Sequence, residues 1–418
     1  MHFVKNLVLF VVKKQLTMNN TKPEVVMIGL GYIGLPTAAL IASKSIQVTG
    51  VDVSREVVDT INKGEIHIVE PDLAGLVHHV VKKDFLKATT EPVVADVYLI
   101  AVPTPFKENH EPDISYVENA VKAIIPVLQS GALIIIESTS PVGTTEKMQK
   151  IILTKKPELN GKIYMAYCPE RVLPGNVIYE LEHNDRAIGG IDEAATEKAV
   201  AFYKLFVKGA LHKTNARTAE MCKLVENASR DGQIAFANEL SMICDKAGIN
   251  VWELINLANK HPRVNILQPG TGVGGHCIAV DPWFIVSEFP EESKMIRSAR
   301  EINNYKTQWV IEKIKNKALA FEIENKRKPL IACMGLAFKP NIDDLRESPA
   351  VTVVNELEKE AFKLLKVEPN LTNGKAEGIT DCEEAVKQAD IVVYLVAHKE
   401  FFNIKTDKIV LDFCGVLK

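Results

Sequence analysis

The sequence predicts an α/β protein with an N-terminal Rossmann domain, a central helical domain built on a long spine helix, and a C-terminal Rossmann-like α/β domain. Three observations predict this fold class. Apolar β-branched runs alternate with helix-length segments early in the chain, a long helical pattern occupies the middle, and the alternation returns near the end. A chain of 418 residues is also too long for one ordinary core, so several domains are expected.

The N-terminal Rossmann domain is expected to cover residues 21–212. Segments long enough for helices separate its apolar runs, which lie at residues 25–28, 47–51, 97–102, 133–136, 163–167 and 186–188. Strands that alternate with helices predict a parallel sheet covered on both faces.

The central domain is expected to cover residues 213–325. Residues 218–247 contain no proline and a single glycine, and their apolar residues recur at helical spacing. This pattern predicts one helix of about thirty residues, followed by shorter helices near 251–259 and 292–316. We expect the long helix to form the interface of a homodimer; the alternative is a helix packed only within its own chain.

The third domain, residues 326–418, is expected to be a smaller α/β unit. Apolar runs at residues 330–334, 391–396 and 409–412 predict strands, and residues 349–360 predict a helix. The two terminal domains therefore share a βαβ character.

Composition excludes several classes of protein. A formal net charge of −3 and a pI near 6.4 leave no electrostatic footprint for nucleic acid or an anionic membrane. Seven scattered cysteines without a CxxC pair predict neither a metal site nor a disulfide framework, and they favour a cytoplasmic location. The apolar run at residues 7–12 is too short to span a bilayer. Residues 1–20 are expected to be a disordered extension, which leaves Met1 and Met18 open as the start.

A glycine-rich turn follows the first predicted strand. Gly29, Gly31 and Gly34 stand in a GxGxxG pattern, and Asp52 closes the next strand. Such glycines let backbone amides approach a pyrophosphate, and the acid favours NAD over NADP by binding the ribose hydroxyls. The alternative is a glycine-rich turn with a surface aspartate. Later strands are followed by Thr104 and Thr139, which are either ligand contacts or helix caps.

A second glycine-rich loop leads to Cys277. Four of the six residues 270–275 are glycine, and a helix start at residues 281–282 follows the cysteine. A thiolate near a helix N-terminus is a nucleophile, and beside a nicotinamide it traps an aldehyde for oxidation through a thioester. The remaining six cysteines are expected to be small buried apolar residues. Adjacent side chains rarely face one another, so we interpret His276 as a loop or substrate contact rather than as half of a Cys–His dyad.

A polar stripe crosses the long central helix. Spacings of three and four place Lys223, Asn227 and Arg230 on one face, with Glu220 one turn earlier. A lysine in this position could stabilise an oxyanion and relay a proton, with asparagine as a second donor. A solvated salt-bridge face is the alternative.

The loop at residues 335–349 carries two cations into the last domain. Lys339 and Arg346 suit a diphosphate, since both can pair with phosphate oxygens. Asp343, Asp344 and Glu347 weaken this interpretation, and an exposed loop of mixed charge is the alternative.

Together, these blocks resemble the UDP-glucose/GDP-mannose dehydrogenase family, in its order and over nearly all of residues 24–418. They read IGLGYIGLPTAA, GEIHIVEPDLA, AVPTPF, AYCPERVLPG, TAEMCKLVEN, HPRVNILQPG, GVGGHCIAVDPWF and GLAFKPNIDDLRESPA. The resemblance is strongest to the bacterial branch that acts on UDP-N-acetyl-D-mannosamine. It implies NAD-dependent four-electron oxidation of C6 to a carboxylate, for surface polysaccharide precursors.

The resemblance also implies roles for individual residues. NAD would contact Tyr32, Ile33, Asp52, Thr104 and Thr139, with Arg346 completing the site near the cofactor. The sugar site would be lined by Arg171, Val172, Lys223, Asn227 and Arg230, and the substrate would also touch His261, Arg263 and Gly274; the resemblance allows Arg263 to come from a partner subunit. The nucleotide would be held by Phe338 and Lys339. Catalysis would use Cys277 as nucleophile, Lys223 as proton donor and acceptor, and Glu170 and Asp281 as candidates for water activation.

Two positions depart from what the resemblance predicts. Members that act on UDP-glucose tend to carry a lysine where Val280 stands, which favours an acetamido sugar. Thr271 replaces an expected proline, and we expect it to loosen the loop without removing a catalytic group. UDP-N-acetylglucosamine, UDP-glucose and GDP-mannose stay open as substrates. Two competing functions also stay open, a two-electron hydroxy-acid or ketol-acid enzyme and a non-catalytic NAD-binding regulator.

Overall fold

The computed structural model describes residues 22–107, 111–172, 175–275, 277–371 and 378–417. The predicted extension at residues 1–20 lies outside them. The chain divides into two compact units. The first combines Met1–Pro105 with Asp113–Lys223, and the second combines Phe106–Pro112 with Leu224–Lys418.

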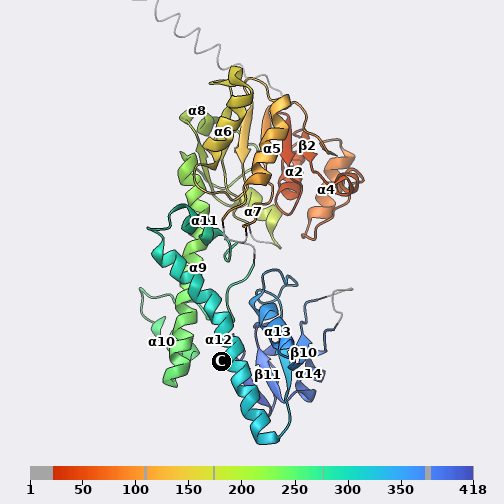
Figure 1. Cartoon of the computed structure of the whole chain (residues 1–418). Helices are drawn as coiled ribbons and strands as arrows, with labels where there is room; N and C mark the ends of the chain where they lie inside the picture. The colour runs from red at the N-terminus through yellow and green to blue at the C-terminus, as the bar shows by residue number, and fades with distance from the viewer. Residues whose placement is uncertain (1–21, 108–110, 173–174, 276, 372–377, 418) are drawn as a thin grey trace, which may run out of the picture. The chain divides into compact units, whose positions relative to one another are not determined.

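The first unit contains an eight-stranded sheet in the order β3-β2-β1-β4-β5-β6-β7-β8, with helices on both faces (Figure 1). Its strands are β1 (Val25–Ile28), β2 (Val48–Val51), β3 (Leu86–Thr89), β4 (Val97–Ile100), β5 (Leu133–Ile136), β6 (Tyr164–Tyr167), β7 (Arg186–Gly190) and β8 (Leu211–Asn215). The first six strands are parallel and follow the order of a dinucleotide-binding fold.

The expectation of a wholly parallel sheet is wrong at one place. β7 pairs with β6 in the antiparallel sense, with Ala166 opposite Gly190, whereas β8 is again parallel to β7. In the described residues between β6 and β7 there is one helix, the seven-residue α7 (Val177–His183), which packs against α2 (Gly34–Ser43). This segment therefore does not return along β6 as a parallel crossover would.

Strand periodicity divides the core of the first unit into two layers. Val25 and Met27 of β1 belong to one apolar cluster, and Val26 and Ile28 belong to the other, because successive side chains of a strand point to opposite faces. Both faces are covered, so β1, β4 and β5 are apolar throughout. The helices are α2, α3 (Arg55–Asn62), α4 (Leu73–Lys82), α5 (Ser115–Ile124), η1 (Ile125–Val127), α6 (Thr144–Lys155), η2 (Pro157–Leu159), α7 and α8 (Glu193–Tyr203).

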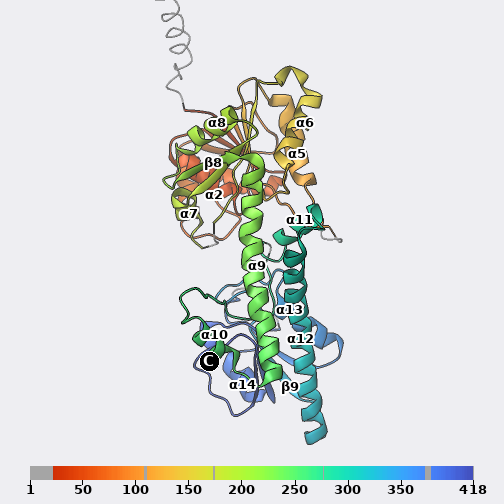
Figure 2. The same ribbon diagram turned by 90° about the vertical axis from the view of Figure 1, so that its left-hand side faces the viewer.

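The predicted spine helix is α9 (Ala216–Ala247), which is 32 residues long. In the second unit it lies beside a second helix of 32 residues, α12 (Lys294–Asn325), in both views (Figures 1 and 2). Buried polar contacts join the two helices: Arg300 Nη1 donates to Asp231 Oδ1 at 2.6 Å, and Asn238 Nδ2 donates to Asn303 Oδ1 at 2.9 Å. The shorter helices are α10 (Val251–Ala258) and α11 (Asp281–Glu288).

The second unit also contains a four-stranded parallel sheet in the order β10-β9-β11-β12. Its elements are β9 (Leu330–Met334), α13 (Pro349–Lys359), β10 (Lys363–Val367), α14 (Cys382–Gln388), β11 (Ile391–Tyr394), η3 (Lys399–Phe401) and β12 (Ile409–Asp412). One apolar cluster joins this sheet to α12 and α13, and a second cluster fills the face beneath α14. The predicted fold class is confirmed.

Among the described residues, none of the helices has the length and apolar character that crossing a membrane requires.

Candidate functional site

The glycine turn after β1 has the geometry of a dinucleotide cradle. Gly29 has a φ of +88°, and a Cβ there would lie 2.6 Å from the Ala101 carbonyl oxygen; a Cβ on Gly34 would lie 1.8 Å from the Gly29 carbonyl oxygen. A Cβ on Gly31, in contrast, would meet no atom within 4 Å. The flanking glycines thus allow close packing while the middle one faces open space, which is the division of roles that NAD binding needs.

Asp52 closes β2 beside this turn and organises its backbone. Its Oδ2 accepts a hydrogen bond from the Leu30 N–H at 3.0 Å, and its Oδ1 accepts one from the Ser54 N–H at 2.9 Å. The carboxylate is half-buried. The N-terminus of α2 has no side-chain cap at Ile33, so its first amides suit a pyrophosphate.

Two adjacent strands, β4 and β5, bring the other predicted cofactor residues to the same edge of the sheet. Thr104 and Thr139 follow these strands and are half-buried, and Tyr32 in the glycine turn is 51% exposed. Ser138, which the sequence pattern did not single out, ties the two loops together. Its hydroxyl accepts from the Val102 N–H at 2.9 Å and lies 2.8 Å from the Val102 carbonyl oxygen. The glycine turn, Asp52 and these loops fit NAD.

Glu220 has a role that the stripe on α9 did not predict. It is fully buried, and its carboxylate accepts hydrogen bonds from the Gly143 N–H at 2.6 Å and from both the N–H and the hydroxyl of Thr145, at 2.8 and 2.7 Å. It therefore caps the N-terminus of α6, whose own N-cap residue, Gly143, offers no side chain. Burial raises the pKa of this carboxyl, against the opposing hydrogen bonds from Thr145 and Gly143.

Glu170 lies on a buried ion pair. Its Oε2 accepts from Arg186 Nη1 at 3.3 Å, and its Oε1 accepts from the Arg171 N–H at 2.6 Å. Burial raises the pKa of the neighbouring Glu137 to about 7. The Glu170 carboxylate is thus held by the buried Arg186 guanidinium. Of the next two residues, Arg171 is exposed and Val172 is half-buried.

Cys277 lies in the turn that leads into α11, as predicted. The thiol residue is exposed and is not part of a disulfide. Its carbonyl oxygen accepts from the N–H groups of Val280 and Asp281, at 3.1 and 2.8 Å. Asp281 is buried at the first position of α11, and its Oδ2 accepts from Asn227 Nδ2 at 2.6 Å. The structure therefore brings together two of the residues expected to act beside the cysteine. His276 lies outside the described residues.

The glycine loop before Cys277 packs on the loop that follows β9. A Cβ on Gly275 would lie 2.9 Å from the ring of Phe338, and a Cβ on Gly274 would lie 2.3 Å from the Glu347 carbonyl oxygen. Side chains at these two positions would force the loops apart. The glycines thus join the predicted nucleophile to the predicted nucleotide loop within one unit.

Three anchors fix the beginning of the same glycine loop. The Gly270 N–H donates to Asn238 Oδ1 at 2.9 Å, Thr307 Oγ1 donates to the Thr271 carbonyl oxygen at 3.1 Å, and Thr271 Oγ1 donates to the Leu395 carbonyl oxygen at 2.6 Å. Thr271 is buried. The expectation that Thr271 loosens the loop is therefore wrong, because its hydroxyl makes a contact that proline could not make.

The remaining predicted residues lie on exposed or half-buried positions. Lys223 is half-buried and Arg230 exposed on α9, where Lys223 precedes Asn227 by one turn, about 6 Å along the axis. His261 and Arg263 are exposed in the turn after α10. The Nζ of Lys339 lies 5.8 Å from the centre of the Phe338 ring.

Arg346 is held within its own loop. Its Nη2 donates to Asp344 Oδ2 at 2.6 Å, and its Nε donates to Asp344 Oδ1 at 2.9 Å. This pair shows that an acidic residue of the loop engages one of its two cations.

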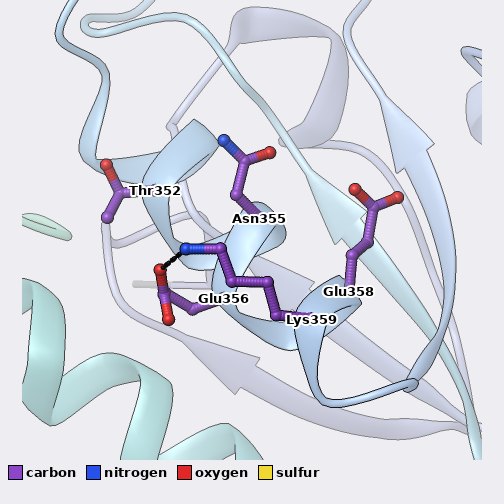
Figure 3. Close-up of a pocket in the computed structure, with 5 residues that line it drawn as sticks. All are labelled: Thr352, Asn355, Glu356, Glu358 and Lys359. Carbon is purple, nitrogen blue, oxygen red and sulfur yellow. Dashed lines mark hydrogen bonds and ion pairs between the residues drawn. The ribbon is translucent and has the colours of Figure 1, made fainter.

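A shallow hollow on α13 contains none of the predicted residues (Figure 3). Thr352, Asn355, Glu356, Glu358 and Lys359 line it, and Lys359 donates to Glu356 at 2.6 Å. These residues all belong to α13, so the hollow is a surface feature of that helix and not part of the site described above.

Comparison with family models supports this arrangement of domains. The NAD binding domain of the UDP-glucose/GDP-mannose dehydrogenase family matches residues 23–207, its central domain matches residues 217–305, and its UDP binding domain matches residues 332–418.

Individual relatives match over almost the whole chain. A UDP-N-acetyl-D-mannosamine dehydrogenase from Campylobacter jejuni is 56% identical, covering 94% of this chain and 99% of the relative. An NDP-N-acetyl-D-galactosaminuronic acid dehydrogenase from Ralstonia nicotianae is 53% identical, covering 93% and 95%. A solved UDP-N-acetyl-mannosamine dehydrogenase from S. aureus is 40% identical with a TM-score of 0.84, covering 94% and 96%.

Proposed function

Because the chain belongs to the UDP-glucose/GDP-mannose dehydrogenase family, we propose that it oxidises UDP-N-acetyl-D-mannosamine at C6 to the uronate. It is an NAD-dependent nucleotide-sugar dehydrogenase, and the proposal concerns the sugar and the roles of its residues. The observation that carries the proposal is the packing of the Cys277 glycine loop, at Gly274 and Gly275, on Phe338 of the UDP-binding domain. This packing lets one bound substrate reach both loops.

The turn at Gly29–Gly34 would hold the pyrophosphate of NAD, and Asp52 would hold the adenosine ribose. Tyr32, Ile33, Thr104 and Thr139 would complete the contacts, with Arg346 at the margin. When bound, NAD accepts a hydride in each of the two oxidations. The half-buried Asp52 carboxylate would repel a 2′-phosphate, so NADP is expected to be a poor substitute.

The chain's own residues account for the proton and acyl steps. Lys223 would take the proton of the C6 hydroxyl as the alcohol becomes an aldehyde, and Asn227, oriented by Asp281, would stabilise the oxyanion. The Cys277 thiolate would add to the aldehyde carbon and form a thiohemiacetal, which becomes a thioester on the second hydride loss. Water would then cleave the C–S bond and release the carboxylate and the thiolate. Glu170 and Asp281 are the candidates to activate that water.

Other residues would fix the sugar nucleotide. Arg171, Val172, Arg230, His261, Arg263 and Gly274 would line the sugar, and Phe338 and Lys339 would hold the nucleotide. The acetamido assignment is supported by Val280, which is buried and apolar beside Asp281, where a lysine is typical of members that act on UDP-glucose.

A second candidate substrate is an N-acetyl-D-galactosamine nucleotide. The relative from Ralstonia nicotianae, whose name refers to an N-acetyl-D-galactosaminuronic acid, is nearly as similar as the one from Campylobacter jejuni, at 53% against 56% identity. Both sugars carry the 2-acetamido group, so Val280 does not separate them.

The test is the NADH released per mole of sugar nucleotide under limiting substrate. UDP-N-acetyl-D-mannosamine is expected to give two NADH, with lower kcat/KM for UDP-N-acetylgalactosamine, UDP-N-acetylglucosamine, UDP-glucose and GDP-mannose. A higher kcat/KM for the galactosamine nucleotide would select the second candidate. One NADH per product would overturn the four-electron reaction.

Cys277→Ala tests the covalent route. This variant should not oxidise the aldehyde but should still bind NAD. The matched control is Cys382→Ala, which replaces a half-buried cysteine of the second unit and should turn over normally. Complete four-electron turnover by Cys277→Ala would exclude a thioester.

A homodimer forms through α9 and α10 in this proposal. Val225, Phe236 and Ile243 are 43%, 56% and 56% exposed, and their spacings of eleven and seven residues place them on one face of α9. Leu257 of α10 is 61% exposed. Such apolar side chains are typical of a buried interface.

The double variant Phe236→Glu with Ile243→Glu should produce monomers in analytical ultracentrifugation. The control Leu319→Glu changes an exposed position on α12 and should leave the dimer intact. A monomeric parent chain would refute this interface.

The proposed location is the cytoplasm. None of the seven cysteines forms a disulfide, which agrees with a reducing compartment. Fractionation of cells that produce the chain would test it, and recovery from the membrane or the medium would contradict it.

A further inference from the structure

A buried acid–histidine pair lies beneath the loop that carries Phe338 and Lys339. Glu368 follows β10 directly and His398 follows β11, and the side chains of both are fully buried. His398 Nε2 and Glu368 Oε2 are 3.0 Å apart. Neither residue has a role in the chemistry described above.

Glu368 binds one end of this loop through its backbone. Its Oε2 accepts from the N–H groups of Leu336 and Ala337, at 2.8 and 2.9 Å, in addition to His398. Its Oε1 accepts from the N–H of Asn370 at 3.1 Å and from Asn370 Nδ2 at 3.3 Å. Hydrogen bonds from His398 and from these backbone amides outweigh the effect of burial and lower the pKa of Glu368 to about 2.

His398 binds the other end of the loop. Its Nδ1 accepts from the Asn341 N–H and faces Asn370 Nδ2, each at 2.9 Å. Because Nδ1 faces two donors, the ring proton belongs on Nε2, where it is donated to Glu368. Asn341 has a φ of +61°, and its Oδ1 accepts from the Lys399 N–H at 2.9 Å. The pair therefore fixes the backbone on both sides of Phe338 and Lys339.

We propose that Glu368 and His398 are positioning residues for nucleotide binding: they hold residues 336–341 in the one conformation in which this loop receives the uridine diphosphate part of the substrate. The inference rests on the proposed function, since it assumes that Phe338 and Lys339 contact the nucleotide. The same loop also packs against the glycine loop, where a Cβ on Gly275 would lie 2.9 Å from the Phe338 ring. Both the pair and the segment before Cys277 therefore contact this loop.

The physical reason for an effect on binding is preorganisation. A loop whose backbone is already ordered loses less entropy when a ligand binds. Without the pair, the N–H groups of Leu336, Ala337 and Asn341 in the loop would lose their acceptors, as would that of Asn370 outside it. The loop would rearrange to satisfy its own three N–H groups. A ligand would then have to restore the native loop.

The experiment is calorimetric titration of the full chain with UDP, a probe that does not depend on which sugar is the substrate. His398→Ala and Glu368→Gln are expected to bind UDP about tenfold more weakly, to raise the KM of the sugar nucleotide similarly, and to leave the KM of NAD within about twofold. His398→Gln should recover part of the affinity, because an amide can both donate to Glu368 and accept from Asn341.

A matched control separates positioning from loss of stability. Val393→Ala removes apolar packing from β11, where Val393 is fully buried, without touching the loop. All variants are compared at a temperature at which circular dichroism shows them folded. If Val393→Ala weakens UDP binding as much as His398→Ala, or if His398→Ala binds UDP like the parent chain, the positioning role is wrong. If the parent chain itself binds no UDP, the proposed substrate class fails, and this inference fails with it.

Discussion

In each of the two sheets, the strand that comes first in the sequence is an inner strand, and a glycine with a positive φ follows it directly. Gly29 after β1 has a φ of +88°, and Gly335 after β9 has a φ of +91°. The strand beside each of them ends on an acid that accepts hydrogen bonds from the turn: Asp52 after β2 and Glu368 after β10. The two α/β regions thus share one backbone plan.

The two turns differ in what fills them. In GLGYIG, the last glycine lets α2 begin at once, with no side-chain cap at its N-terminus. In GLAFKP, Pro340 stands at that place, and α13 begins only at Pro349, where the Ser348 side chain accepts from the Val351 N–H. The first turn leaves helix amides for a ligand, whereas the second presents a loop.

The two acids also differ, both in burial and in the number of hydrogen bonds that they accept. Asp52 is half-buried and accepts two backbone hydrogen bonds, while Glu368 is buried and accepts five hydrogen bonds from three backbone groups and two side chains. A ribose can therefore approach Asp52 but not Glu368. In the proposed function, the same strand arrangement holds NAD in one region and supports a nucleotide-binding loop in the other.

The largest effect is expected from Gly34→Ala in the first turn. A Cβ there would lie 1.8 Å from the Gly29 carbonyl oxygen, so the backbone must move. We expect a loss of about 3 kcal/mol or more in the free energy of unfolding, measured by urea denaturation, together with loss of NAD binding. Gly75→Ala in α4, where a Cβ meets nothing within 4 Å, is the control and should be neutral or stabilising. Normal stability of Gly34→Ala would show that the close packing is not required.

The next effect concerns Glu368 and depends on pH. The pKa of Glu368 is lowered from 4.5 to about 2. The contribution of its ionised carboxylate to the free energy of unfolding is therefore complete above about pH 4.5 and is lost as the pH falls towards 2. The full shift corresponds to about 3 kcal/mol. Glu368→Gln should therefore be less stable than the parent at pH 7 in urea denaturation, and this difference should shrink at pH 3. A difference that stays constant with pH would mean that the charge of Glu368 contributes nothing.

Asp52→Asn is expected to have a smaller effect and to act on binding. An amide keeps the shape but removes the charge that repels a 2′-phosphate, so the KM of NAD should rise about tenfold, which is about 1.4 kcal/mol, and NADP should become a better substrate. Steady-state kinetics with both cofactors measure this. An unchanged preference for NAD over NADP would show that the role of Asp52 is limited to its hydrogen bonds with Leu30 and Ser54.

Much of the fold could be predicted from the sequence because central strands are apolar on both faces. The bounds of the central strands β1, β5 and β9 match the predicted runs, and so do those of β12, an edge strand whose four residues IVLD are all apolar except the last. The three strands that the sequence pattern did not predict, β3, β8 and β10, all lie at sheet edges, where one side faces solvent and polar residues interrupt the pattern. In β8, whose sequence is LHKTN, every residue is half-buried or exposed.

The candidate site was predictable where residues stand close together in sequence, as around Gly29, Gly34 and Cys277. The supporting residues were not. Ser138, Glu220, Glu368 and His398 act on backbone groups 31 to 77 positions away, and no local pattern marks such partners. An acid directly after the second strand of a βαβ unit led to Asp52, and Glu368 occupies the equivalent place. The same signal did not point to Glu368, because the strand before it, β10, was not predicted.

The smallest effect is expected at the margin of the second turn, from Arg346. Its side chain is 55% exposed and pairs with Asp344, and exposed pairs contribute little, so Arg346→Ala should change the free energy of unfolding by less than about 0.5 kcal/mol. Asp344→Ala is the informative companion. If Arg346 contacts the cofactor, only Arg346→Ala should raise the KM of NAD, whereas Asp344→Ala removes the ion pair between Asp344 and Arg346 and leaves that KM equal or lower. If Arg346→Ala and Asp344→Ala have the same KM for NAD, Arg346 only stabilises its own loop and does not contact the cofactor.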